Sequence, residues 1–358
     1  MDFSISDDQK SLQQLAHTIL GEQATHDHLK TLEAGSWSVF DRPLWSRLAE
    51  AGLVGIAVSE EQGGAGLGFL DLAIVLEEVG RAVAPVPAVA TLVTAYVLAQ
   101  AGVGAARLDG VAAGNTILTT AFEGEVTARS DGDGWMLDGE KTFVPYGAEA
   151  DVVVVLATSD DRPVVALVPR GSSGVTVTEL ETTNREPQAQ LAFEGVRLAA
   201  ADVVTGATDL IHDLRMHTTA ALAVVAAGVC RAALDMTAKH TISREQFGKP
   251  IATFQAVGQR AADAYIDTEM VALTAWQAAW RLSAGLPADD EVAVAKFWAG
   301  DGGMRALHAC QHLHGGLGVD LDYPLHRYFL WGKQLEHELG TPTGQLLTLG
   351  ANLAATPV

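Results

Sequence analysis

The 358-residue chain is acidic and rich in apolar residues, with 23 Lys and Arg against 44 Asp and Glu, a net charge of −21 and 48% hydrophobic residues. This charge makes nucleic acid and anionic membranes poor partners, although a local basic pocket can still hold an anionic ligand. The length favours two domains, or one large domain with an insert, around a large core.

The two cysteines, Cys230 and Cys310, each lie inside a helical pattern. Buried free thiols are therefore expected rather than a disulfide, which fits a reducing cytosol. The N-terminal residues lack a basic region followed by an apolar core, and no charge-free apolar run reaches membrane-spanning length. We therefore expect a cytoplasmic protein with no signal peptide and no membrane segment.

Residues 1–113 are predicted to be helical. Ser6 and Gln9 have the spacing of a helix-capping pair at the start of the first helix, and a second helix ends near Ala51 and Gly52. A third helix is predicted over 70–81, with Glu77 and Glu78 exposed. The apolar stretch 83–101 is interpreted as a buried helix.

Residues 114–206 are predicted to form a separate β-domain, because short runs rich in Val, Thr and Leu alternate with Gly and Asp turns. The motif Asp131-Gly132-Asp133-Gly134 is a hairpin signal. It lacks the other ligands of a calcium loop. The predicted strands are 116–121, 134–137, 151–157, 164–168 and 175–177.

Residues 207–358 are predicted to form a bundle of long antiparallel helices with short connections. The chain is therefore expected to be α, then β, then α. The predicted helices are 210–244, 253–283, 289–314, 324–339 and 341–354.

A polar break separates the first two of these helices, between His240 and Gln255. Arg244 offers a guanidinium suited to phosphate, Gln246 and Gln255 offer amides, and Phe247 offers a flat ring. An ordinary helix corner with a solvated arginine is the alternative interpretation.

The motif Gly315-Gly316-Leu317-Gly318 follows a helix, so it is not a Rossmann dinucleotide fingerprint. Such a glycine pair is either a simple helix C-cap or a place where backbone N–H groups meet a phosphate. The nearby histidines lack the further ligands of a metal site, and none is predicted. No nucleophile elbow or Ser-His-Asp spacing is present.

Two of these motifs together resemble the acyl-CoA dehydrogenase family. They are the sequence from Arg244 to Pro250, followed by Phe254 and Gln255, and the sequence 312–318, followed by Tyr323 and Arg327. The resemblance covers nearly the whole chain and implies an α+β fold. That fold has an N-terminal helical domain (1–113), a middle β-barrel or sandwich domain (114–206) and a C-terminal four-helix bundle (207–358).

The resemblance also implies FAD bound at a subunit interface, an acyl-CoA substrate and electron-transfer flavoprotein as the acceptor. In the family, one subunit holds the flavin ring, and its neighbour holds the adenine and pyrophosphate end of the cofactor. The positions of this chain that match the nucleotide half are Arg244, Gln246, Phe247, Gln255, His312, Gly315 and Gly316.

The flavin half and the catalytic base depart from the family pattern. Phe143 stands in place of the Trp that covers the flavin ring, and Pro145 stands in place of a Thr that hydrogen-bonds the flavin. The two positions where the family carries its catalytic Glu are Leu339 and Thr218 here. No catalytic residue is therefore assigned to this chain.

This pattern is similar to the base-lacking subunit of the heterotetrameric (α2β2) acyl-CoA dehydrogenases of actinobacterial steroid side-chain β-oxidation. The resemblance implies FAD shared with a second acyl-CoA dehydrogenase subunit that carries the Glu. Two alternatives remain open. One is a self-sufficient homotetramer that uses Glu338 or Glu336 as base, and the other is a cofactor-free structural or binding homologue.

Overall fold

The computed structural model describes residues 5–355, and its contacts divide the chain into two compact units. One unit holds the residues up to Thr31, Ala73–Ala84 and the residues from Thr219 on. The other holds Leu32–Leu72 and Pro85–Thr218. Residues 1–4, on which part of the signal-peptide prediction rests, lie outside the described range. The predicted boundaries at 113/114 and 206/207 stay a prediction, because the two units cut across them.

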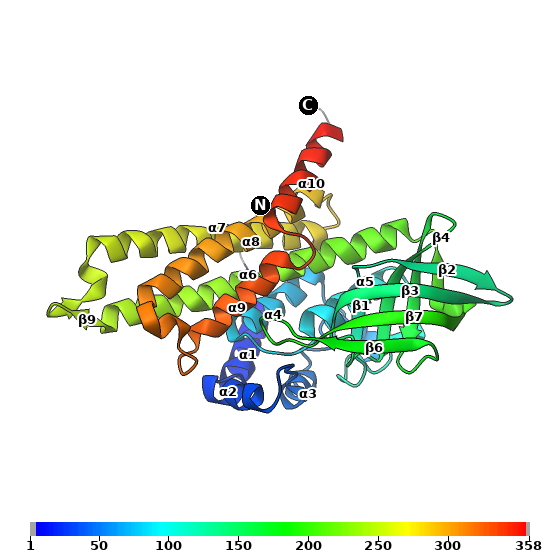
Figure 1. Ribbon diagram of the computed structural model, residues 1–358, viewed down its shortest axis with the longest axis horizontal. Helices are drawn as coiled ribbons and strands as arrows, with labels where there is room; N and C mark the ends of the chain where they lie inside the picture. Colours follow the sequence, from blue (N-terminus) through cyan, green and yellow to red (C-terminus); the bar gives the residue numbers. More distant parts are fainter. Residues whose placement is uncertain (1–4, 356–358) are drawn as a thin grey trace. The chain divides into compact units, whose positions relative to one another are not determined.

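The N-terminal region is helical, as predicted (Figure 1). Ser6 and Gln9 form the predicted capping box: each side chain accepts a hydrogen bond from the other residue's backbone N–H, which satisfies amides that the helix leaves unpaired. The helices are α1 (Asp7–Gln23), α2 (His26–Gly35), α3 (Arg42–Glu50), α4 (Phe69–Ala82), a π-helical turn η2 (Val89–Val93) and α5 (Thr94–Gln100), with short 3₁₀ turns η1 (Glu60–Gln62) and η3 (Ala105–Arg107).

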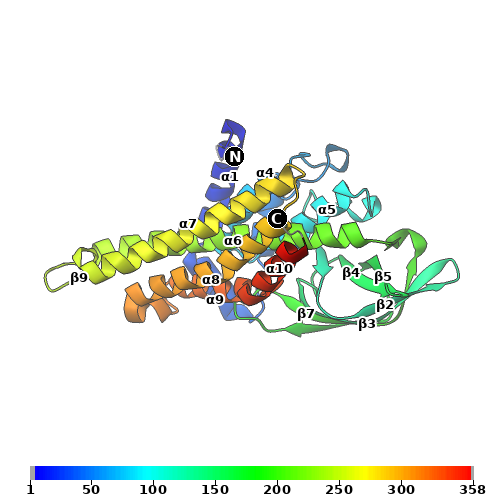
Figure 2. The ribbon, with the colours of Figure 1, turned by 90° about the horizontal axis from the view of Figure 1, so that it is seen from above.

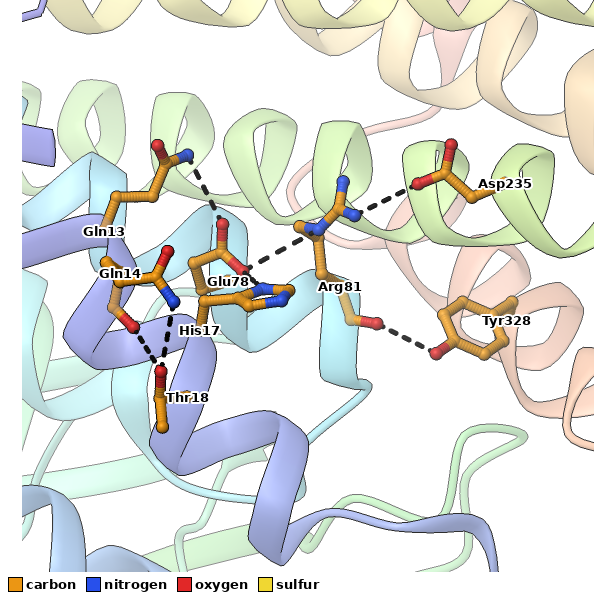
Figure 3. A network of polar contacts seen from close by, with 8 residues as sticks. All are labelled: Gln13, Gln14, His17, Thr18, Glu78, Arg81, Asp235 and Tyr328. Atoms are coloured by element: carbon orange, nitrogen blue, oxygen red, sulfur yellow. Dashed lines mark hydrogen bonds and ion pairs between the residues drawn. The ribbon is translucent and has the colours of Figure 1, made fainter.

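The prediction that Glu77 and Glu78 of α4 are exposed was wrong. Glu78 is only 3% exposed, and its Oε2 lies 2.8 Å from His17 Nδ1 of α1 (Figure 3). Its Oε1 accepts a hydrogen bond from Gln13, and Arg81 Nε lies 3.7 Å from its Oε2. A buried carboxylate is tolerated when it is paired in this way. The polar side of α4 can therefore be buried in addition to its apolar side.

Close packing explains why α4 has no solvated face beside Glu77. A Cβ on Gly228 of the long helix α6 (Thr208–Ser243) would lie 2.0 Å from the Glu77 carbonyl oxygen, so only glycine permits this approach. Glu77 Oε2 accepts a hydrogen bond of 2.8 Å from the Trp276 indole, and burial raises the pKa of Glu77. Helical spacing alone does not reveal this second buried face.

The middle region forms one eight-stranded sheet. Its hydrogen-bonded path runs β6-β7-β3-β2-β4-β5-β8, and β1 pairs with β4. The strands are β1 (Leu118–Ala121), β2 (Val126–Asp131), β3 (Gly134–Pro145), β4 (Val152–Ser159), β5 (Arg162–Pro169), β6 (Val175–Leu180), β7 (Gln188–Ala199) and β8 (Val203–Thr205), with the 3₁₀ turn η4 (Ala200–Asp202) before β8.

The sheet folds over on itself around one apolar core (Figure 2). Buried residues of β4 and β5, such as Val155 and Ala166, belong to the same cluster as Leu137 of β3 and Phe193 of β7. The predicted hairpin is present, since Asp131 pairs with Gly134 across the turn between β2 and β3. The β-domain prediction is therefore confirmed, although β2, β7 and β8 were missed.

The C-terminal region returns to helix and confirms the predicted α, β, α order. Helix α6 is followed by α7 (Gln255–Ser283), α8 (Asp289–His314), α9 (Leu325–His337) and α10 (Pro342–Ala355), with the 3₁₀ turns η5 (Ile251–Thr253) and η6 (Gly315–Val319). Both cysteines are free and buried, as expected, and burial raises the pKa of each thiol.

Helix α6 is long and apolar enough that composition alone would permit it to cross a membrane. Its most apolar window is 83% buried inside the protein, so the apolar residues form packing contacts. Within the described residues, α6 is the single helix that meets this criterion.

Candidate functional site

The polar break after α6 is a short β-hairpin at the tip of the helix pair α6 and α7 (Figure 1). Strand β9 (Glu245–Gln246) pairs antiparallel with β10 (Lys249–Pro250). The Arg244 N–H donates to the His240 carbonyl at 2.8 Å, and the Arg244 carbonyl accepts from the Ile251 N–H at 2.8 Å. The backbone of Arg244 is therefore fixed at the base of the hairpin, while its side chain is exposed.

Phe247 occupies the tip of this hairpin in an unfavourable conformation. Its φ is +55°, and its side chain is 93% exposed. A left-handed backbone costs a non-glycine residue about 1 kcal/mol or more, and an exposed aromatic ring gains nothing from burial to offset that cost. Such strain is typical of positions that serve a binding role.

The end of α8 leaves backbone open to solvent. Gly315 has φ 59° and ψ −137°, a conformation that favours glycine, and both Gly315 and Gly316 are exposed. A Cβ on either glycine would meet no atom within 4 Å. His312, in the last turn of α8, is exposed as well. The Gly315 N–H donates to the His312 carbonyl within the helix cap, so the Gly316 N–H, at the start of η6, is the group that this turn can present to an anion.

Two stacked histidines bring these motifs to the same end of their unit. The rings of His240 and His314 lie 4.3 Å apart with an interplanar angle of 19°. His240 is one helical turn before Arg244, and His314 directly precedes Gly315. The predicted nucleotide residues all lie at the ends of α6, α7 and α8 or in the hairpin, and they are exposed: Arg244, Gln246, Phe247, Gln255, His312, Gly315 and Gly316. Their binding role stays a prediction.

Sequence reasoning gave His240, His314 and Tyr323 no role in the cofactor site, although His240 begins the polar break and the other two belong to the second motif. His314 was considered only as a metal ligand. Within residues 5–355, no group of three or more His, Cys, Asp or Glu is arranged to hold a metal ion. The position of His240 four residues before Arg244, on the same helix face, was the available signal.

The flavin half corresponds to the end of the inner strand β3, residues 141–145, together with Thr119 of β1. This end of the strands, the sheet edge, is built differently. Lys141 of β3 is 2% exposed, and its Nζ donates to the carbonyls of Gly124 at 2.7 Å and Phe122 at 3.3 Å. Burial lowers the pKa of Lys141 to about 8. The Thr119 hydroxyl donates to the Pro145 carbonyl at 2.6 Å. These polar groups are satisfied within the sheet.

Phe143 and Pro145 of β3 complete this edge. Phe143 has φ +50° and is 61% exposed, so it is strained and solvated like Phe247. Pro145 carries neither a hydroxyl nor an N–H, and its carbonyl is already bonded. The edge therefore offers no side-chain donor at the position where the family uses a threonine.

The turn after α9 contains Leu339, one of the two positions that match the family's catalytic Glu. Leu339 has φ +52°, and the buried Lys296 holds the turn by donating to the carbonyls of Leu335 at 2.8 Å and Gly340 at 2.9 Å. The neighbouring Glu338 is partly buried, and burial raises its pKa to about 7. The second position, Thr218, is buried on α6 and carries no ionisable group.

Comparisons with known proteins agree with the fold. The chain matches the acyl-CoA dehydrogenase N-terminal domain over residues 6–107, the middle domain over 116–196 and the C-terminal domain over 209–354. It is 41% identical to the acyl-CoA dehydrogenase FadE27 of Mycobacterium tuberculosis over 375 aligned residues, covering 100% of both chains.

Two solved structures are similarly close. A chain of the ChsE4-ChsE5 complex from Mycobacterium tuberculosis is 41% identical with a TM-score of 0.94, covering 100% of both chains. A chain of a Tcur3481-Tcur3483 steroid acyl-CoA dehydrogenase variant is 42% identical with a TM-score of 0.91, covering 98% of both chains. The chain therefore belongs to the acyl-CoA dehydrogenase family, whose enzymes are FAD-dependent oxidoreductases of lipid β-oxidation.

Proposed function

We propose that this chain is one subunit of a heteromeric (α2β2) FAD-dependent acyl-CoA dehydrogenase. It donates the adenine and pyrophosphate half of the cofactor site, and a second subunit supplies the flavin cradle and the catalytic Glu. The observation that carries this proposal is the contrast between an open nucleotide end and a sheet edge whose donors are used internally.

The residues at the nucleotide end fit the phosphate and adenine chemistry of FAD. Arg244 would hold the pyrophosphate through its guanidinium fork, and the Gly316 N–H would add a donor beside Gly315, whose own N–H caps α8. Phe247, Gln246, Gln255 and His312 would contact the adenosine end. Glycines with open space at the Cβ position allow a ligand to approach the backbone closely. FAD, when bound, supplies the hydride acceptor of the dehydrogenation.

The proposal also rests on the missing base. Removal of the α-proton of an acyl-CoA thioester needs a carboxylate within hydrogen-bond reach of that carbon. Leu339 and Thr218 stand at the two positions where the family places this group. A side chain without an ionisable group cannot take the proton, so a partner subunit has to provide the Glu.

Support for the partner and the substrate class comes from the relatives. One similar structure is a complex of two named chains, ChsE4 and ChsE5, and another is a steroid acyl-CoA dehydrogenase with two named chains. We propose a steroid side-chain CoA ester as the substrate, electron-transfer flavoprotein as the electron acceptor and the cytoplasm as the location.

A second candidate is a self-sufficient enzyme that uses Glu338 as base. The observation in its favour is the pKa of about 7, which suits a general base near neutral pH. Two observations count against it. Lys296 fixes the turn by donating to backbone carbonyls, including that of Glu336 at 3.3 Å. The position that matches the family's catalytic Glu is the next residue, Leu339, and not Glu338. Glu336 is engaged with Lys333 at 2.6 Å.

The visible absorption of purified protein tests these candidates. The heteromeric subunit is expected to be colourless when produced alone and yellow when co-purified with the partner dehydrogenase subunit. A yellow protein without a partner would instead favour the self-sufficient enzyme. A colourless protein in both preparations would favour a cofactor-free structural homologue.

A further inference from the structure

The stacked rings of His240 and His314 join the two nucleotide motifs, although neither residue is among those predicted to contact the nucleotide. His240 is half-buried on α6, and His314 is buried at the end of α8. Their rings are nearly parallel at 4.3 Å, a separation at which flat rings are in direct contact. The stack therefore links the helix that leads into Arg244 with the helix that ends at Gly315.

His314 is fixed in one orientation. Its Nδ1 lies 2.8 Å from the Cys310 carbonyl, and because a carbonyl only accepts, this nitrogen carries the proton. In the neutral ring, the Tyr323 hydroxyl then donates to Nε2 at 3.2 Å. The Tyr323 ring also packs against His314 with centroids 5.2 Å apart. His314 is therefore a rigid platform on which His240 rests.

We infer that the His240–His314 stack is a positioning pair, which holds the Arg244 hairpin and the Gly315-Gly316 turn at the spacing that one diphosphate group requires. The inference rests on the proposed cofactor site. Arg244 is one turn beyond His240 and joined to it by a backbone hydrogen bond, so a shift of His240 carries Arg244 with it. A bound diphosphate bridges the two motifs only while this spacing is kept.

The stack also predicts how cofactor binding depends on pH. Besides each other, the two rings face Arg244, which directly follows α6, and the phenol of Tyr323, which follows η6. Burial lowers the pKa of both histidines, and Arg244 lowers that of His240 further. The neutral stack is thus complete above the ordinary imidazole pKa of about 6.5 and is lost as the pH falls through the lowered values.

The test measures the dissociation constant of FAD from the assembled complex between pH 5.5 and 8. His240→Ala, which removes the stack, is expected to weaken binding by up to about tenfold at pH 8. His240→Phe keeps a flat ring, so its binding should stay within about twofold of the unchanged complex at pH 8, with a shallower loss on acidification. His308→Ala is the matched control, because His308 is also on α8 and contacts an aromatic ring, that of Phe329, at 4.9 Å.

Arg244→Ala distinguishes failure of the positioning role from failure of the proposed nucleotide site. If this variant weakens FAD binding but His240→Ala does not, the positioning role is wrong and the proposed function stands. If Arg244→Ala leaves binding unchanged, the proposed nucleotide site itself fails. Binding that tightens on acidification, with the effect lost in His240→Phe, would make His240 a direct phosphate ligand and overturn the positioning role. Should His240→Ala not assemble, the pH dependence of His240→Phe decides.

Discussion

Two exposed phenylalanines with left-handed backbone mark the two halves of the expected cofactor site. Phe247 has φ +55° in the hairpin after α6, and Phe143 has φ +50° at the edge of the middle sheet. In the half that contains Phe247, the side chain of Arg244 and the glycine backbone after α8 are open to solvent. Around Phe143, Lys141 and Thr119 donate to nearby carbonyls.

This difference separates a surface that is built for a ligand from one that is built for the fold. Polar groups that are exposed and unpaired can bind without first losing internal hydrogen bonds. Groups already satisfied inside the sheet would have to lose such bonds before they could bind a flavin. Our proposal thus assigns cofactor binding in this chain to the hairpin and the glycine turn alone.

The largest expected effect on this comparison comes from Arg244. Arg244→Ala should weaken FAD binding to the complex by ~30–100-fold, because a charge-assisted hydrogen bond contributes about 2–3 kcal/mol. Arg244→Lys should recover only part of it, since it keeps the charge but loses the fork. Arg215→Ala is the control: Arg215, on α6, lies 3.9 Å from Glu123, and its loss should leave the dissociation constant unchanged. Equal losses of FAD affinity in Arg244→Ala and Arg215→Ala would contradict the difference between the nucleotide end and the sheet edge.

Lys141 tests whether the sheet edge serves the fold. Lys141→Met removes the donor that the Phe122 and Gly124 carbonyls share and should lower the free energy of unfolding by about 1–3 kcal/mol. Chemical denaturation measures this change, and Lys239→Met, at an exposed lysine of α6, should stay within about 0.5 kcal/mol. The FAD content of the complex should not change. A complex that stays stable but loses FAD would place the flavin in this chain.

The two phenylalanines give a matched pair of substitutions. Phe247→Gly and Phe143→Gly should each relieve about 1 kcal/mol of backbone strain, measured as a higher midpoint of thermal unfolding of the chain. Only Phe247→Gly should also reduce FAD affinity, by up to about tenfold, because stacking of an aromatic ring on adenine is lost. A loss of FAD affinity in Phe143→Gly instead would reverse the assignment.

The smallest expected effect concerns turnover in Glu338→Gln and Glu336→Gln. Neither should change turnover of the assembled complex by more than about twofold, whereas loss of a true base lowers it by ~10²–10⁴. A drop of that size with FAD still bound would place the base in this chain.

Stability should respond to Glu338 even if turnover does not. Burial raises its pKa from 4.5 to about 7, so the folded chain holds more protons than the unfolded chain between these values. The free energy of unfolding therefore falls as the pH rises through this window. Glu338→Gln removes that loss, so denaturation at pH 8 should show a gain of about 1–3 kcal/mol that is absent near pH 4.

The order of the regions and the ends of the long helices could be predicted from the sequence. Apolar periodicity and capping signals located α6 to α10 within a few residues, because local patterns decide where such helices stop. The strand β7 escaped prediction, since its polar residues interrupt the alternation. The burial of Glu78 also escaped prediction, because it depends on Gln13 and His17 of α1, which are more than 60 residues away in the sequence.

The candidate site shows the same division between local and distant information. Motif spacing singled out Arg244 and Gly315. Motif spacing did not show the left-handed backbone of Phe247 in the hairpin. It also did not show the contact between His240 and His314, because these residues are 74 positions apart in the sequence. Local signals thus identified the residues of the candidate site, whereas their arrangement in space depends on how the helix ends pack.

The number of FAD molecules in the assembled complex distinguishes a nucleotide half-site in this chain from a complete flavin site. If this chain contributes only a nucleotide half-site, quantitative flavin release should give one FAD for each pair of unlike subunits, and Arg244→Ala in this chain should reduce that content. One FAD per chain, half of it retained when Arg244 is replaced, would mean that this chain holds a complete flavin site and would contradict the account.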